Sequence, residues 1–222
     1  MTGGMDFSAL IQGIAIAALP IILAITLHEA AHGYAARHFG DPTAWLQGRI
    51  SANPFKHIDP VGTVVLPFIL FVIGSPFIFG WAKPVPVNFG NLRNPKRDML
   101  WVAAAGPGSN FAMALLWAAI LKAAWVTPLN YFSVPMAEMA KIGITINVVL
   151  MVLNLFPLPP LDGGRIAVSL LPHRLAWKFS QVERFGFPIL LILLFTGILG
   201  AVLRPFMAIV TSLIALIFQL PT

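Results

Sequence analysis

The stretch Leu27-His28-Glu29-Ala30-Ala31-His32-Gly33 places two imidazoles and a carboxylate at the end of an apolar segment. Residues 7 to 27 precede it with Gln12 as their only strongly polar side chain, which is enough apolar chain to cross a bilayer as a helix. On such a helix His28 and His32 lie on one face, where both can bind one metal ion. Glu29 points about 100° away, and in a zinc hydrolase it is free to act as a general base.

The position of this polar group within an apolar helix indicates a function. A His-Glu-x-x-His string on a surface helix can arise by chance and mean nothing. A carboxylate inside a bilayer costs on the order of 2 to 3 kcal/mol, so such groups usually face an interior and take part in function. The sequence therefore favours metal-dependent catalysis.

The composition is that of an integral membrane protein: 58% of the residues are hydrophobic, 10% are charged and the mean hydropathy is +0.85. Four to six membrane segments would nearly exhaust 222 residues, leaving no room for a separate soluble domain. The net charge of +6 lies in short loops, which favours a role in membrane orientation over nucleic-acid binding. The absence of cysteine excludes disulfides and thiolate ligands. Residues 1 to 8 carry no Lys or Arg, so a cleaved signal peptide is not expected.

We predict an all-α polytopic membrane protein that forms one domain over residues 1–222. Helices at about 7–39, 99–125 and 135–156 form a three-helix catalytic core. A short surface β-hairpin at 43–60 and a re-entrant segment at 61–88 follow the first helix. Additional C-terminal transmembrane helices occupy about 185–220, either as one tilted helix or, as we favour, as two segments hinged at Arg204-Pro205.

A catalytic zinc ion needs a third protein ligand besides the two histidines. Asp162 follows a proline-rich turn, and Gly163-Gly164 can aim its carboxylate back into the protein. Taken alone, an Asp at this position is more often a helix cap. It is, however, the acidic residue best placed at membrane depth in the second half of the chain. His38 and His57 have no helical partner at ligand spacing and are expected to be exposed or interfacial.

Binding of one ion by His28, His32 and Asp162 constrains the helix directions. The first and fourth segments must run parallel and the third antiparallel to them, so residues 61–80 must return to the side from which they start. The loops assigned to the active-site side contain eleven of the fourteen basic residues. By the positive-inside rule that side is cytoplasmic, in a plasma or inner cell membrane.

Three motifs in this order resemble the site-2 proteases, a family of intramembrane zinc metalloproteases: His28-Glu29-Ala30-Ala31-His32, Gly106-Pro107-Gly108-Ser109-Asn110, and Asn154-Leu155-Phe156-Pro157 with Leu161-Asp162-Gly163. Residues 48–60 and 80–88 resemble the compact prokaryotic branch, which lacks PDZ and CBS domains. The resemblance covers about His28 to Arg165.

This resemblance implies one Zn²⁺ ion held by His28, His32 and Asp162, with Glu29 as the catalytic base. It also implies that Asn154 and Pro157 position the substrate and that Asn110 lines the site. The implied reaction is hydrolysis of peptide bonds in membrane-embedded protein substrates, as in regulated intramembrane proteolysis. The partners are therefore a transmembrane protein substrate and the lipid bilayer.

The alternate prolines of residues 81–88 force an extended backbone. This segment is either a rigid linker or an edge that pairs, near Asn88, with an unwound substrate strand. Other functions also stay open. A different membrane zinc peptidase would take Glu138 or Glu183 as third ligand, a metal carrier would use the histidines to pass ions, and a pseudoprotease would bind membrane partners without cutting them.

Overall fold

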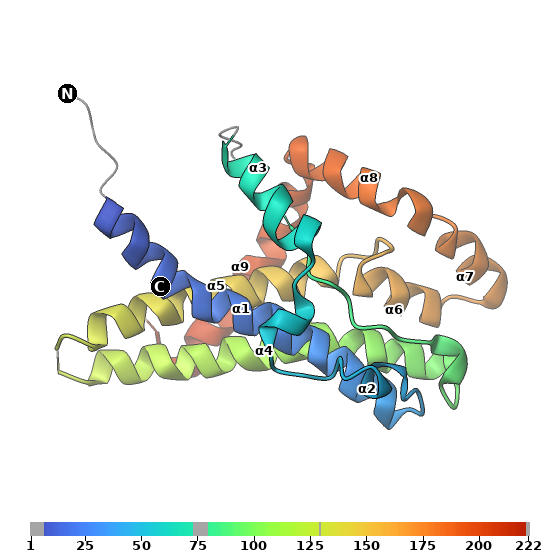
Figure 1. Ribbon diagram of the computed structural model, residues 1–222, viewed down its shortest axis with the longest axis horizontal. Coiled ribbons are helices and arrows are strands. Elements are labelled where there is room, and N and C mark those ends of the chain that lie inside the picture. Colours follow the sequence, from blue (N-terminus) through green and yellow to red (C-terminus); the bar gives the residue numbers. More distant parts are fainter. Residues whose placement is uncertain (1–6, 73–79, 129, 221–222) are drawn as a thin grey trace.

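The computed structural model describes residues 7–72, 80–128 and 130–220. Three long helices form its centre: α1 (Phe7–His38), α4 (Pro95–Val126) and α5 (Ser133–Asn154). α4 packs against both α1 and α5, and α1 also packs against α5. Figure 1 shows that α1 and α5 run in the same direction and α4 in the opposite one. These are the directions that a shared metal site requires.

Four of the described helices are long and apolar enough to cross a membrane: α1, α4, α5 and α9 (Ile198–Phe218). The chain is accordingly an all-α, multi-pass membrane protein, as the composition predicted. The remaining C-terminal helices are shorter: α6 (Asp162–Leu170), α7 (His173–Ser180) and α8 (Glu183–Phe195).

The predicted β-hairpin at 43–60 is wrong, because the described residues contain no strand. The region instead forms α2 (Thr43–Leu46) and the 3₁₀ turn η1 (Pro54–His57). Residues that favour helix starts explain why helical turns form here in place of strands. Asn53 accepts a hydrogen bond from Phe55 N, and the prolines at helix starts cannot donate to a strand ladder.

Residues 60–72 are also helical, as the π-helical turn η2 (Pro60–Val65) and α3 (Leu66–Val72). The side chain of Asp59 caps this start by accepting hydrogen bonds from Val61 N and Gly62 N. The middle of the predicted re-entrant segment, 73–79, lies outside the described residues, so its path stays a prediction.

The C-terminal helices separate at Gly197, not at Pro205. Gly197 has φ +75°, a left-handed conformation that glycine adopts without steric cost, and it directly precedes α9. Pro205 lies within α9, where transmembrane helices tolerate proline. The predicted proline hinge is therefore wrong, although the division into two helices is found.

Asp41 anchors the extended segment that returns to the bundle. Its fully buried carboxylate accepts hydrogen bonds from Thr43 N, Asn88 N and the Asn91 amide. Burial would raise the pKa of this carboxyl, but the hydrogen bonds from Thr43, Asn91 and Asn88 outweigh it and hold the pKa below its ordinary value. A charged Asp41 thus ties the 3₁₀ turn η3 (Phe89–Asn91) to the end of α1.

Candidate metal centre

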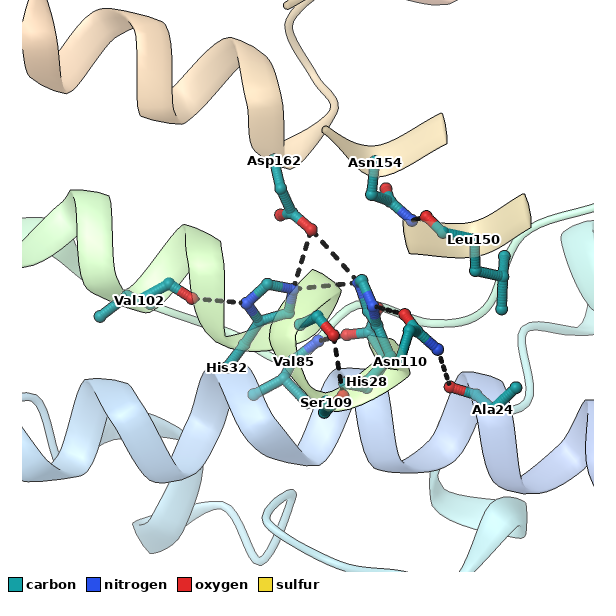
Figure 2. Close-up of polar contacts among 12 residues, drawn as sticks. Ala24, His28, His32, Val85, Val102, Ser109, Asn110, Leu150, Asn154 and Asp162 are labelled. Atoms are coloured by element: carbon teal, nitrogen blue, oxygen red, sulfur yellow. Dashed lines mark hydrogen bonds and ion pairs between the residues drawn. The ribbon is translucent and has the colours of Figure 1, made fainter. Parts of the chain in front are cut away.

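His28 and His32 lie one turn apart on α1 and face Asp162 at the start of α6 (Figure 2). Their Nε2 atoms are 3.1 Å apart, and Asp162 Oδ2 lies 3.3 Å from each. Asp162 Oδ2 is buried without a hydrogen-bond donor, and its carboxylate makes no capping hydrogen bond. The carboxylate therefore faces the imidazoles and does not serve as a helix cap.

The other ring nitrogen of each histidine is held from behind. His32 Nδ1 donates to the carbonyl of Val102 at 2.8 Å, and His28 Nδ1 donates to Asn110 Oδ1 at 2.6 Å. A proton held at Nδ1 leaves Nε2 of a neutral imidazole as an acceptor. Hydrogen bonds of this kind fix the tautomer and the ring orientation of metal-binding histidines.

The residues present fit a zinc ion. Four ligands at about 2.0–2.1 Å in a tetrahedron lie about 3.3 Å from one another. The three measured separations, 3.1, 3.3 and 3.3 Å, agree with that value. Two neutral imidazoles and one carboxylate form a ligand set found in catalytic zinc sites, which keep a fourth position open. Within the part of the chain that the structure describes, this is the one group of three such side chains close enough to share an ion.

Glycines allow close approach at two places: where α4 meets the histidines of α1, and where α6 meets the proline-rich turn before it. A Cβ on Gly106 of α4 would lie 2.4 Å from His32 Nε2 and 2.6 Å from His28 Cε1. A Cβ on Gly163 would lie 2.2 Å from the Leu155 carbonyl oxygen, and one on Gly164 would lie 2.3 Å from Pro159 N. Gly163 and Gly164 therefore serve close approach to the proline-rich turn, and neither has a positive φ.

Glu29 receives one strong hydrogen bond from the extended segment. Val85 N donates to Glu29 Oε2 at 2.7 Å. Pro84 and Pro86 have no N–H, so Val85 is the only backbone donor in this Pro-Val-Pro run. The other oxygen, Oε1, makes no hydrogen bond with the described residues. The carboxylate is therefore fixed at one oxygen and open at the other.

The comparisons with known proteins agree with this geometry. A family model described as Peptidase family M50 matches residues 126–197. The chain is 40% identical over 190 residues to "Putative zinc metalloprotease YwhC" of Bacillus subtilis, covering 84% of this chain and 83% of that protein. The chain belongs to peptidase family M50, the site-2 proteases.

Relatives from mycobacteria give the same assignment. The protease is 29% identical over 180 residues to "Putative zinc metalloprotease Rip2" of Mycolicibacterium smegmatis, covering 81% of this chain and 66% of that protein. It is 27% identical over 172 residues to the Mycobacterium tuberculosis protein of the same name, covering 78% of this chain and 63% of that one. No solved structure matches the chain significantly. These relationships identify the protein as a zinc metalloendopeptidase.

The other predicted site residues of the protease lie in different environments. Asn110 is fully buried behind His28. Asn154, near the end of α5, donates to the Leu150 carbonyl, and its own amide oxygen makes no hydrogen bond with the described residues (Figure 2). Pro157 is exposed in the following turn. The Asn88 side chain caps η3 by accepting from Gly90 N and makes no hydrogen bond to the histidine cluster.

The alternative ligands lie elsewhere. Glu138 pairs with Lys141 at 2.7 Å, and Glu183 lies 3.6 Å from Arg165; both glutamates are exposed. His38 is exposed as expected. His57 is 2% exposed and contacts the Ser51 carbonyl through Nε2, so the expectation of an exposed His57 is wrong, whereas an interfacial place stays a prediction.

Sequence reasoning missed several groups that contact the predicted site residues. Val85 and Val102 act through backbone atoms, which no side-chain pattern reveals. Asn147 on α5 also escaped attention, although a polar side chain in an apolar helix is a usable signal. The small residues of the Gly106 motif did predict close helix approach, which the structure shows.

Val85→Pro should reduce peptide cleavage at least tenfold in kcat, because hydrogen bonds to charged groups contribute about 1.5–3 kcal/mol. The substitution removes the donor to Glu29 within a backbone that is already extended, and zinc content should not change. Val85→Ala keeps the N–H and is the matched control, expected within about twofold of the wild type. Equal kcat for Val85→Pro and Val85→Ala would contradict a role for this hydrogen bond.

Proposed function

We propose that this protease cuts peptide bonds in the membrane-embedded segments of transmembrane proteins, as in regulated intramembrane proteolysis. His28, His32 and Asp162 would hold one zinc ion, and Glu29 would act as the base. The observation that carries the proposal is the convergence of three acceptor atoms at 3.1–3.3 Å. Both histidines lie on α1, a helix long enough to cross a membrane, and this supports a substrate within the bilayer.

The residues divide the chemical work. A zinc ion bound at this site supplies a Lewis acid that polarises the scissile carbonyl and acidifies water. Glu29 takes a proton from the attacking water at its open oxygen and delivers it to the leaving amide nitrogen as the C–N bond breaks. Val85 N–H holds the second oxygen of Glu29 during this transfer. Asn110 and Val102 keep the two imidazoles oriented.

A transmembrane substrate helix hides its amides in its own hydrogen bonds, so it must unwind before attack. We propose that Asn154, Pro157 and Asn88 position the unwound strand. Support comes from the unbonded amide oxygen of Asn154 and from the exposed turn at Pro157.

The extended segment 81–88 can form fewer backbone hydrogen bonds with a substrate strand than its extended shape suggests. The backbone N–H groups of Trp81, Lys83, Val85 and Asn88 already donate within the chain. Pro84 and Pro86 have none. The carbonyls of Trp81, Lys83 and Pro84 also accept hydrogen bonds, from the side chains of Thr63 and Arg49. A substrate strand that pairs with this segment would therefore find most of its backbone groups already in use.

We further propose that the active site faces the cytoplasm from a plasma or inner cell membrane, with residues 61–88 following a re-entrant path. The segments assigned to one side, short helices and helix ends included, carry eleven of the fourteen basic residues, which supports this orientation. Since α1 crosses once toward the site, the N-terminus would lie outside.

Glu29→Gln should abolish cleavage, with a loss of about 10²–10⁴-fold, because the amide cannot accept the proton. Zinc content should stay at the wild-type level. Quantitative proteomics of membranes from cells with wild type or Glu29→Gln tests this for any membrane substrate, because uncut proteins should accumulate in the variant. Glu138→Gln, a surface carboxylate paired with Lys141, is the control. Identical membrane proteomes for Glu29→Gln and wild type would refute the proposal, and so would normal turnover.

Asn154→Ala should reduce cleavage of a reconstituted substrate about tenfold, mainly through KM, while zinc content is unchanged, because an amide contact to substrate is lost. Thr145→Val on the same helix removes a similar side-chain bond to a helix carbonyl and should have no effect. Wild-type KM and kcat for Asn154→Ala would show that Asn154 does not bind the substrate.

A reporter fused to the N-terminus tests the orientation. Alkaline phosphatase at this position should be active, because it requires export, and a cytoplasmic fluorescent fusion should be dark. If the fluorescent fusion is bright and the phosphatase fusion is inactive, the N-terminus is cytoplasmic, and the assignment of the active site to the cytoplasmic side is overturned.

A further inference from the structure

We propose that Asn147 on α5 is a positioning residue for the metal centre, acting on His28 through Asn110. The inference rests on the proposed role of His28 as a zinc ligand. Asn147 is fully buried and lies on a different helix from both histidines. Two amide side chains thus connect α5 to an imidazole on α1.

The contacts form a continuous chain across three helices. Asn147 Nδ2 donates to the Gly143 carbonyl at 2.8 Å, and Asn147 Oδ1 accepts from Asn110 Nδ2 at 2.9 Å. Asn110 Nδ2 also donates to the Ala24 carbonyl at 3.1 Å. Asn110 Oδ1 then accepts from His28 Nδ1 at 2.6 Å. Figure 2 shows the Asn110 end of this chain, with Ala24 and His28 on either side of the amide.

Each link has only one possible direction. A backbone carbonyl can only accept, so Gly143 fixes the NH₂ group of Asn147 and turns the Asn147 oxygen toward Asn110. That oxygen and the Ala24 carbonyl are both acceptors, and together they use both N–H groups of Asn110. The oxygen of Asn110 must then face His28, which sets the proton of His28 at Nδ1.

The direction of this last hydrogen bond matters for metal binding. If the Asn110 amide were reversed, its NH₂ group would face His28 Nδ1, which would have to accept. The His28 proton would move to Nε2 and point at Asp162 and His32, where a zinc ligand needs a lone pair. Asn147 therefore stabilises the tautomer that binds metal.

A structural role alone would be simple interhelical adhesion, since buried amides hydrogen-bond across membrane helices. The two roles differ in their dependence on Asn110. Adhesion between α5 and α4 affects stability regardless of what Asn110 does for His28. Positioning of His28 by Asn147 can occur only while Asn110 is present to transmit it.

The test is a double-mutant cycle on zinc affinity, measured for the purified full-length chain by competition with a chromophoric chelator. Asn110→Leu should weaken zinc binding about 10–100-fold, the range for groups that orient a ligand. Asn147→Leu should weaken it about threefold to tenfold, because Ala24 still holds one N–H of Asn110. The double variant should match Asn110→Leu alone. The visible absorption of Co²⁺-loaded protein should change for Asn147→Leu, and Thr145→Val should leave both readouts unchanged.

Asn147→Leu with wild-type zinc affinity would overturn the inference, and so would an equal loss of affinity with and without Asn110. Melting temperatures in excess chelator establish that each variant is folded. If a leucine variant is not folded, the cycle is repeated with Asn147→Ala and Asn110→Ala. The cavity left at residue 147 is then present with and without Asn110, so its effect cancels when the two losses of zinc affinity are compared. Failure of the underlying function is distinguishable, because it would appear as wild-type zinc affinity in His28→Ala or Asp162→Ala.

Discussion

The structure depends on three hydrogen-bond acceptors that converge without a donor between them. Two imidazole nitrogens and a carboxylate oxygen lie within 3.3 Å of one another, largely buried. Buried acceptors of this kind repel one another and cost free energy unless a cation lies among them. The separations suit zinc, and membership of the M50 family identifies the chain as a zinc metalloendopeptidase. The remainder of the fold can be understood as the means of holding these three atoms together.

Each of the three central helices contributes something different to that task. α1 carries both histidines and Glu29, α4 supplies Val102, Gly106 and Asn110, and α5 leads into the turn that presents Asp162. The extended segment adds the hydrogen bond from Val85 to Glu29, and Asp41 secures the far end of that segment. The proposed metal ligands, the proposed base and the groups that contact them therefore come from parts of the chain far apart in sequence, so the site exists only in the assembled bundle.

The sequence predicted the cluster of His28, His32 and Asp162, which the structure brings together, because metal-binding chemistry depends on side-chain type. The spacing of His28 and His32 defines one helix face, and the need for a third ligand singled out Asp162. It did not predict the region after α1, where Asn53 and Asp59 cap short helical turns in place of the expected hairpin. It also did not predict the break at Gly197, where a left-handed glycine outweighs Pro205. The supports of the site were missed for another reason. Backbone donors such as Val85 N–H leave no trace in residue identity, and the use of Asn147 depends on helix packing.

The most direct test of the central claim is the zinc content and zinc X-ray absorption spectrum of the purified protein and of Asp162→Ala. We predict one zinc ion per chain in the wild type, with only nitrogen and oxygen neighbours at about 2.0–2.1 Å and the signature of two imidazoles. Asp162→Ala should lose most of the zinc under the same conditions. Full zinc occupancy in Asp162→Ala with an unchanged spectrum, or a wild-type ion with fewer than two imidazole neighbours, would contradict this metal centre.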